Sequence, residues 1–271
     1  MNDIVVLIPH YNNIEGLKRS IASIKENVDI LVIDDGSSEK PRLEELINCQ
    51  QNPKVKIEIL YLDTNQGIEH ALNSGLNLIL QKPYKYIARL DAGDICAPNR
   101  FSIQKQYLEQ NSDVYLVGSW AKVIYENSGE QYILKRPIDW ESIRKGMFIN
   151  NMFVHPTVMF RKELIEEIGI YPTNYKYAED YAYFFKIVQR YKCENIPYPL
   201  VEYYINSNSI SLRFYRTQLK SRIKIIWNHR EPNVYFIYGL CRNVLLLLFP
   251  KILIEKLKKM FHKFIVNKNL N

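Results

Sequence analysis

The chain has 271 residues, 47% of them apolar and 24% charged, so it can bury a full core and is not intrinsically disordered. Its net charge of +7 is uneven: residues 211–271 hold 13 Lys or Arg against 2 Asp or Glu, and residues 1–210 carry a net of −4. The four cysteines form no CxxC pair, which disfavours a zinc site or a disulfide framework and fits a reducing cytosol. No basic region followed by an apolar run opens the chain, so we expect no signal peptide.

Short apolar runs alternate with helical patterns over about the first 110 residues. The runs predict strands at 5–8, 30–33, 55–62, 86–90 and 114–117. The spacing of apolar residues and prolines predicts helices at 14–24, from 41 onward, at 68–80 and at 98–110. This alternation predicts an α/β fold with an open, mostly parallel sheet and helices on both faces.

Polar or acidic loops follow three of these strands, at 9–12, 34–37 and 91–94. The carboxyl ends of parallel strands share one edge of a sheet, so these loops can line one crevice. Asp91 and Asp94 can hold a divalent cation against a phosphate, although aspartates at strand ends also cap helices. Neither GxGxxG nor GxxxxGK[ST] follows the first strand, which makes a metal the favoured phosphate partner.

Residues 120–206 show a less regular pattern. A hairpin is expected around 127–129, followed by a His155-Pro156 segment and by a helix from 178 to about 190 that Glu179 and Asp180 open. No internal repeat or linker is visible. We therefore expect residues 1–210 to form one domain with two halves, 1–110 and 111–210.

Five motifs, in their order along the chain, resemble those of the family 2 inverting glycosyltransferases of the GT-A fold. They are 8–12 (IPHYN), 34–38 (DDGSS), 65–67 (NQG), 90–94 (LDAGD) and 178–181 (AEDY). The resemblance implies a nucleotide-sugar-binding half at 1–110, an acceptor-binding half at 111–210, and Mn²⁺ or Mg²⁺ as cofactor. The family usually has an aspartate where this chain has Gly93, which leaves Asp91 and Asp94 as candidate metal ligands.

The resemblance also implies which residues bind the nucleotide sugar. They are Pro9, Tyr11, Asn12, Asp34, Asp35, Gly67, Arg89, Asp91 and Ala92. Tyr11 can stack on the nucleobase or pack on the first helix. Asp35 can accept from a uracil N–H, or one of Asp34 and Asp35 caps the turn with Ser37. Arg89 can assist at the diphosphate or simply pair with a nearby acid.

Asp180 is the expected catalytic base, with Glu179 as its orienting neighbour. An inverting transfer needs a base that takes the proton of the acceptor hydroxyl. The alternative is that both acids only complement the dipole of the helix that they open. His155 is expected to contact the diphosphate or the acceptor, or to be a structural histidine ahead of Pro156.

Residues 211–271 are expected to form a basic, helical tail. The apolar run 234–249 has 16 residues, fewer than the about 20 that a helix needs to cross a bilayer. Residues 251–264 place apolar side chains on one helical face and basic ones on the other, a pattern typical of a helix on an anionic membrane surface. The apolar face and the lack of a reading motif argue against nucleic acid. Packing against the domain or a second subunit is the remaining alternative.

These inferences predict a hexosyl- or N-acetylhexosaminyltransferase on the cytoplasmic face of a bacterial membrane. The resemblance implies a UDP-sugar donor and a growing surface glycan as acceptor: lipopolysaccharide, capsule or a lipid-linked oligosaccharide. One alternative is a metal-dependent nucleotidyltransferase, which should carry a glycine-rich basic loop after the first strand. The other is a catalytically inactive scaffold of the same fold, which the glycine at position 93 suggests.

Overall fold

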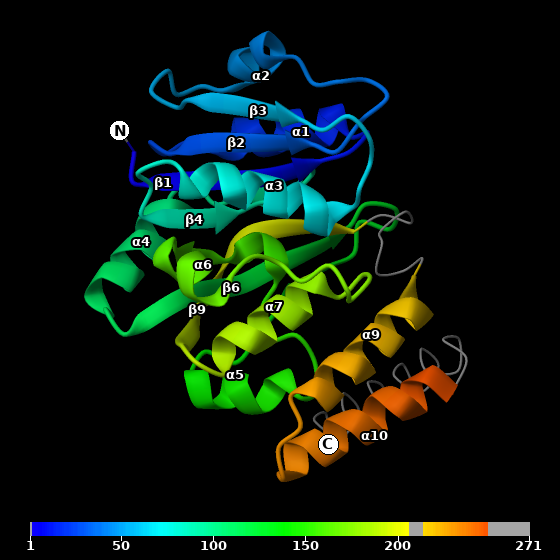
Figure 1. Ribbon diagram of the computed structural model, residues 1–271. Helices are drawn as coiled ribbons and strands as arrows, with labels where there is room; N and C mark the ends of the chain where they lie inside the picture. The colour runs from blue at the N-terminus through cyan, green and yellow to red at the C-terminus, as the bar shows by residue number, and fades with distance from the viewer. Residues whose placement is uncertain (1, 206–213, 249–271) are drawn as a thin grey trace, which may run out of the picture.

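The computed structural model describes residues 2–205 and 214–248, which form one sheet with helices around it (Figure 1). Its strands are β1 Ile4–His10, β2 Asp29–Asp34, β3 Ile57–Tyr61, β4 Tyr86–Arg89, β5 Ile95–Cys96, β6 Val114–Tyr125, β7 Gln131–Leu134, β8 Met159–Arg161 and β9 Lys192–Ile205. Its helices are α1 Ile14–Ser23, α2 Leu43–Cys49, α3 Ile68–Leu80, α4 Arg100–Gln110, α5 Trp140–Met147, the 3₁₀ helix η1 His155–Thr157, α6 Glu163–Ile168, α7 Glu179–Val188, α9 Tyr215–Asn228 and α10 Val234–Leu248.

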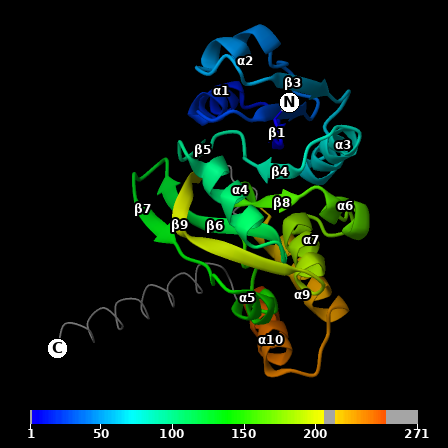
Figure 2. The same ribbon diagram turned by 90° about the vertical axis from the view of Figure 1, so that its left-hand side faces the viewer.

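The N-terminal half of the sheet is parallel, as the alternating pattern predicts. Its strands lie in the order β3-β2-β1-β4. Successive side chains of a strand point to opposite faces, so β1 contributes to two cores. Val5 and Leu7 join the core under α3, and Val6 and Ile8 join the core under α1. Figure 2 shows α1 and α4 on one side of the sheet and α3, α6 and α7 on the other.

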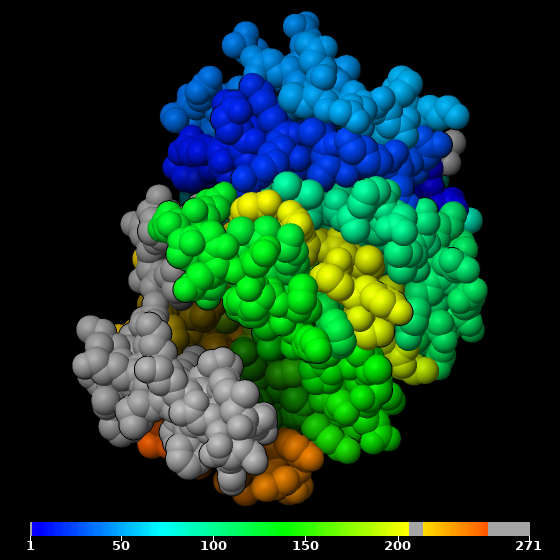
Figure 3. Space-filling view, turned by 180° about the vertical axis from the view of Figure 1, so that it is seen from behind, coloured from blue at the N-terminus to red at the C-terminus, as the bar shows by residue number. Residues whose placement is uncertain are grey.

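The C-terminal half of the sheet is mixed. β8 runs antiparallel between β4 and β6, and β9 runs parallel to β6 over most of its length. The expected hairpin is present as β6 and β7, with Gly129 at φ +70° in its turn. From behind, β9 reaches the surface between the β6–β7 hairpin and α4 (Figure 3). Pro197 and Pro199 of β9 interrupt the strand pattern in the sequence, because proline has no backbone N–H to donate to a neighbouring strand.

The helices α9 and α10 pack against the C-terminal half of the domain. Ile225 and Ile226 of α9 belong to the core that also contains α7. Gly239 of α10 lies so close to the end of α5 that an added Cβ would clash with the carbonyl oxygen of Phe148. Residues 214–248 are therefore packed on the domain, and a boundary near residue 210 stays a prediction. The predicted amphipathic segment 251–264 lies outside the described residues.

Residues 234–248 of the predicted apolar run form α10, and several apolar side chains of this helix face outward. They are Val234, Tyr235, Ile237, Tyr238, Val244, Leu245 and Leu248. None of the described helices combines the length and the apolar character that crossing a bilayer requires.

Candidate active site

Two connected cavities form one cleft at the carboxyl ends of the parallel strands. The small pocket, about 650 Å³, is lined by the segments that follow β1, β2, β3 and β4. The large pocket, about 1130 Å³, extends from the same strand ends toward η1, α7 and the β6–β7 hairpin. The two share Tyr11, Asn13, Ile68, Asp91, Ala92 and Tyr177. The loops that the sequence predicts at one sheet edge thus meet there.

The small pocket contains Pro9, Tyr11, Asp35 and Gly67 of the predicted nucleotide site. Asp35 accepts hydrogen bonds from the backbone N–H groups of Gln66 and Gly67, each at 2.9 Å. It therefore fixes the turn before α3. Tyr11 is half exposed at the wall that both pockets share, a position open to a planar ligand.

Asp34 lies elsewhere. It is fully buried, and its Oδ1 accepts from the Nδ1–H of His10 at 2.8 Å, because Nε2 of that ring accepts from the backbone of Asn13. Asp34 lines neither pocket, so its observed contacts are those of a residue that holds the β1 loop. Asn12 lines the large pocket at φ +49°, and its Oδ1 accepts from the backbone N–H of Ser38 at 2.9 Å.

Arg89 is fully buried and also lines neither pocket. Its Nη2 donates to Oδ1 of Asp91 at 2.5 Å, and its Nη1 donates to the carbonyl oxygens of Leu7 and Leu90, each at 3.0 Å. Its Nε donates to Nε2 of His155 at 3.3 Å. These contacts match the ion-pair alternative: Arg89 positions Asp91 and His155, which do face the cleft.

His155 faces the large pocket as a neutral ring. Burial, and then the charge of Arg89, hold the pKa of His155 well below its usual value. Nε2 accepts from Arg89 and lies 2.9 Å from the hydroxyl of Tyr171, so the ring proton belongs on Nδ1. A neutral Nδ1–H is a hydrogen-bond donor for a phosphate or sugar oxygen in the cleft.

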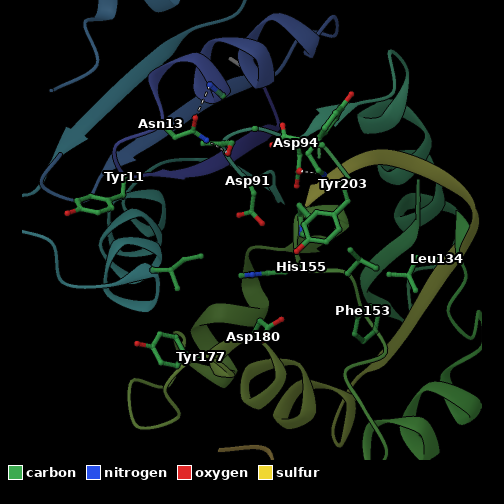
Figure 4. A pocket seen from close by; sticks show the side chains of 18 of the residues that line it. Tyr11, Asn13, Asp91, Asp94, Leu134, Phe153, His155, Tyr177, Asp180 and Tyr203 are labelled. Carbon is green, nitrogen blue, oxygen red and sulfur yellow. Dashed lines mark hydrogen bonds between the residues drawn. The ribbon is translucent and has the colours of Figure 1, made fainter. Parts of the chain in front are cut away.

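Asp91 and Asp94 lie together at the roof of the large pocket (Figure 4). Oδ1 of Asp94 accepts from the backbone N–H of Tyr204 at 2.9 Å, while its Oδ2 is buried with no hydrogen-bond partner among the described residues. Burial, and then the charge of Asp91, raise the pKa of Asp94 well above its ordinary value. An unpartnered carboxylate oxygen beside a second carboxylate fits a hard divalent cation.

The described residues contain no cluster of three or more His, Cys, Asp or Glu that could hold a metal. A metal ion held by Asp91 and Asp94 would therefore take its remaining ligands from oxygens of the substrate or of water. Gly93, where the family usually has an aspartate, has φ +119°, a region that side chains rarely adopt. Its carbonyl oxygen accepts from Nη2 of Arg19 at 2.5 Å.

Asp180 faces the large pocket from the first turn of α7, opposite Asp91 in Figure 4. Its Oδ2 accepts from Nδ2 of Asn151 at 2.9 Å, and burial raises its pKa. Glu179 is buried, and its Oε2 has no partner among the described residues. Burial, and then the charge of Asp180, raise the pKa of Glu179 to about 8. Burial beside Asp180 thus favours the protonated form of Glu179 at neutral pH.

Sequence reasoning did not identify several residues of the cleft. Asn151 holds Asp180, and Tyr203 lines the large pocket from β9. Tyr177 has φ +61° and stacks on Phe214, with ring centroids 4.2 Å apart. Gln218 of α9 donates to the carbonyl oxygen of Tyr177 at 2.8 Å. These residues are recognised as site residues only by a positive φ or by a tertiary contact, and the periodicity of apolar residues in the sequence predicts neither.

The mostly parallel sheet with helices on both faces and paired aspartates at its strand ends matches the GT-A fold of glycosyltransferases. The sequence model of "Glycosyl transferase family 2" matches residues 5–169, and the chain belongs to this family.

Named relatives agree with this assignment. An uncharacterized glycosyltransferase of Haemophilus influenzae is 32% identical over 86% of this chain and 73% of its own length. The UDP-Gal:alpha-D-GlcNAc-diphosphoundecaprenol beta-1,3-galactosyltransferase of Escherichia coli is 27% identical over 94% of this chain and 92% of its own. The amylovoran biosynthesis glycosyltransferase AmsE of Erwinia amylovora is 29% identical over 81% and 83%.

Solved structures show the same fold at low identity. TarS of S. aureus, residues 1–349 in complex with UDP-GlcNAc, has a TM-score of 0.63 and 16% identity, and covers 90% of this chain and 72% of its own. The mannosyltransferase PcManGT of Pyrobaculum calidifontis, in complex with GDP-Man and Mn²⁺, has a TM-score of 0.61 and 14% identity over 90% and 69%.

Proposed function

We propose that this glycosyltransferase moves a hexosyl or N-acetylhexosaminyl group from a UDP-sugar to a hydroxyl of a growing surface glycan, with inversion. The observation that carries the proposal is the meeting of Asp35, Asp91 and Asp180 in one cleft, although they lie far apart in sequence. The E. coli relative, which uses UDP-Gal and a diphosphoundecaprenol-linked acceptor, supports the donor and the acceptor class, and the E. amylovora relative, which acts in amylovoran biosynthesis, supports the acceptor class.

The nucleotide would occupy the small pocket, between Tyr11 and the turn that Asp35 fixes. Its sugar would then project past Asp91 into the large pocket. The acceptor hydroxyl gives its proton to Asp180 as its oxygen bonds to the anomeric carbon from the face opposite the departing UDP. The raised pKa of Asp180 suits a proton acceptor. Asn151 orients its carboxylate by a 2.9 Å hydrogen bond.

Asp91 and Asp94 are the residues that would hold Mn²⁺ or Mg²⁺ in this proposal. Such an ion supplies positive charge to the departing diphosphate. Arg89 fixes the orientation of Asp91, and the unpartnered Oδ2 of Asp94 is free to coordinate. The Nδ1–H of His155 donates a hydrogen bond to the diphosphate or the acceptor from the pocket wall.

The place of action in this proposal is the inner face of the cell membrane. A net charge of +11 over residues 211–271 and the outward apolar side chains of α10 support an anionic membrane surface as partner. Enzyme and lipid-linked acceptor would then share one surface.

Incubation with a panel of UDP- and GDP-sugars, with detection of the released nucleotide, tests the proposal. We expect UDP release that depends on a glycan acceptor, and a product whose NMR spectrum shows the inverted anomer. Release of pyrophosphate would instead indicate a nucleotidyltransferase. Binding of a nucleotide sugar without turnover on any acceptor would indicate an inactive scaffold.

A further inference from the structure

The large pocket is lined by many acids and few bases. Its acids are Glu15, Asp91, Asp94, Glu126, Glu179 and Asp180, and its arginines are Arg19 and Arg136. Arg19 is engaged: its Nη2 contacts Glu126 at 3.2 Å and the Gly93 carbonyl oxygen at 2.5 Å, and its guanidinium lies 4.2 Å from the ring centroid of Tyr204.

Arg136 differs from the other arginines of this region. Among the described residues its side chain makes no ion pair or hydrogen bond, and its Nε is buried without a partner. The buried Arg89, by contrast, uses all three of its nitrogens. Burial lowers the pKa of Arg136, which remains a cation at neutral pH. A half-buried guanidinium without a partner carries a desolvation cost that a bound anion would offset.

The backbone fixes where Arg136 stands. It lies in the segment between β7 and α5, and its carbonyl oxygen accepts from Nε1 of Trp120 on β6 at 2.9 Å. The next residue, Pro137, accepts from Nδ2 of Asn195 on β9 at 2.8 Å. Arg136 lines the large pocket together with Asp180 and is absent from the walls of the small one. It therefore stands on the acceptor side of the cleft.

We propose that Arg136 binds an anionic group of the acceptor, a phosphate or a carboxylate, while Asp180 meets the acceptor hydroxyl. This inference rests on the proposed function, because it takes the large pocket as the acceptor site. The other charged groups of the lining are mostly acids, so a cation without a partner among the described residues also sets the direction in which an anionic acceptor enters. The anion has two chemical sources: a diphosphate that joins the sugar to a lipid, or the carboxylate of an acidic sugar.

A binding experiment on the full chain, with UDP present to fill the small pocket, tests this without turnover. The probes share one short alkyl tail: an alkyl N-acetylglucosaminyl diphosphate, an alkyl glucuronide and the neutral alkyl N-acetylglucosaminide. Calorimetry would compare wild type with Arg136→Gln, Arg136→Lys and Arg190→Gln. Arg190→Gln is the matched control, because it removes the same charge at an exposed position outside both pockets.

We expect wild type to bind one anionic probe about ten-fold or more tightly than the neutral one, the scale of a charge-assisted hydrogen bond. Arg136→Gln should remove this preference, Arg136→Lys should retain part of it, and Arg190→Gln should leave it intact. Preference for the diphosphate assigns the anion to the lipid link, and preference for the glucuronide assigns it to the sugar. Equal binding of all probes by wild type, or an unchanged preference in Arg136→Gln, would overturn the inference. A chain that binds the probes but transfers nothing would refute only the proposed function.

Discussion

At the scale of single residues, neighbours in sequence have different tasks. Asp34 and Asp35 are adjacent at the end of β2, yet Asp34 is paired with His10 inside the loop and Asp35 borders the small pocket. The sequence motif predicts both aspartates as site residues, because a motif does not show to which side of the strand each side chain points. Adjacent side chains at a strand end point to opposite sides, so one acid of such a pair is available to hold structure.

Replacing Asp180 tests the proposed base. We expect Asp180→Asn to lower kcat by about 10² or more, the scale of general-base catalysis, while UDP still binds. Single-turnover kinetics and calorimetry with UDP measure the two effects separately. Asp113→Asn is the matched control, because Asp113 is exposed, lies outside both pockets and pairs with Lys192 at 3.1 Å. Near-normal turnover in Asp180→Asn would move the base to another residue.

Glu179 should make stability depend on pH. Its pKa rises from 4.5 to about 8 in the folded chain, so the folded state keeps a proton that the unfolded state loses. Its contribution is fully present below pH 4.5 and is lost as pH rises toward 8, with a slope of up to about 1.4 kcal/mol per pH unit. Glu179→Gln keeps a neutral side chain and should remove this slope. Urea titrations of both chains at several pH values check it, and parallel curves would contradict it.

The metal proposal has a residue-scale test. We expect EDTA to abolish transfer and Mn²⁺ or Mg²⁺ to restore it, because the diphosphate leaves with two negative charges. Asp94→Asn should weaken Mn²⁺ binding, which electron paramagnetic resonance reads without any turnover. Full activity after exhaustive metal removal would rule out the proposed cofactor.

At the scale of elements, the strands and helices of the N-terminal half are predictable and much of the C-terminal half is not. β1, β2 and β4 are short apolar runs that end in polar loops, so the apolar pattern and the polar residues that follow it predict these strands. β9 contains two prolines, its register shifts opposite Trp120 of β6, and its residues pair with β6 residues 77–80 positions earlier in the chain. Only tertiary pairing makes such a segment a strand, and Tyr203 enters the site with it.

The helix α9 contacts the loop that holds Asp180, the proposed base. Nη2 of Arg222 donates to Oδ1 of Asn150 at 2.5 Å, and the next residue, Asn151, holds Asp180. We expect Arg222→Gln to lower kcat several-fold with little change in the KM for the donor, because charged hydrogen bonds of this kind contribute about 1.5–3 kcal/mol. Arg216→Gln, an exposed arginine of the same helix, is the control. Equal kinetics for the two variants would show that α9 does not support Asp180.

At the scale of the whole molecule, charge and apolar surface concentrate toward the C-terminus. Residues 1–210 carry a net of −4, and residues 211–271 carry +11. The described part of that region already presents outward apolar side chains on α10, such as Ile237 and Leu245. The sequence predicted this asymmetry in full, since charge is additive along a chain. It did not predict how closely α9 and α10 pack on the domain, since that depends on contacts such as Gly239 with Phe148.

The charge asymmetry predicts membrane binding that depends on lipid charge. We expect the full chain to float with anionic liposomes and not with neutral ones, because each Lys or Arg near the surface contributes roughly 1 kcal/mol. Removal of residues after Leu248 should shift the protein toward the unbound fraction, while activity on a short soluble acceptor is retained. If the intact chain does not bind anionic liposomes, the membrane assignment is refuted.

The carbonyl oxygen of Ile149 has a consequence for engineering chimeric enzymes. It accepts from Arg222 on α9 and from Arg242 on α10, each at 3.3 Å, two positions before the residue that holds Asp180. A swap of C-terminal helices between relatives, cut near residue 210, would separate these donors from the loop that they contact. Residues 148–151 and the two helices contact one another as one unit, so we expect a graft that moves them together to preserve the position of Asp180.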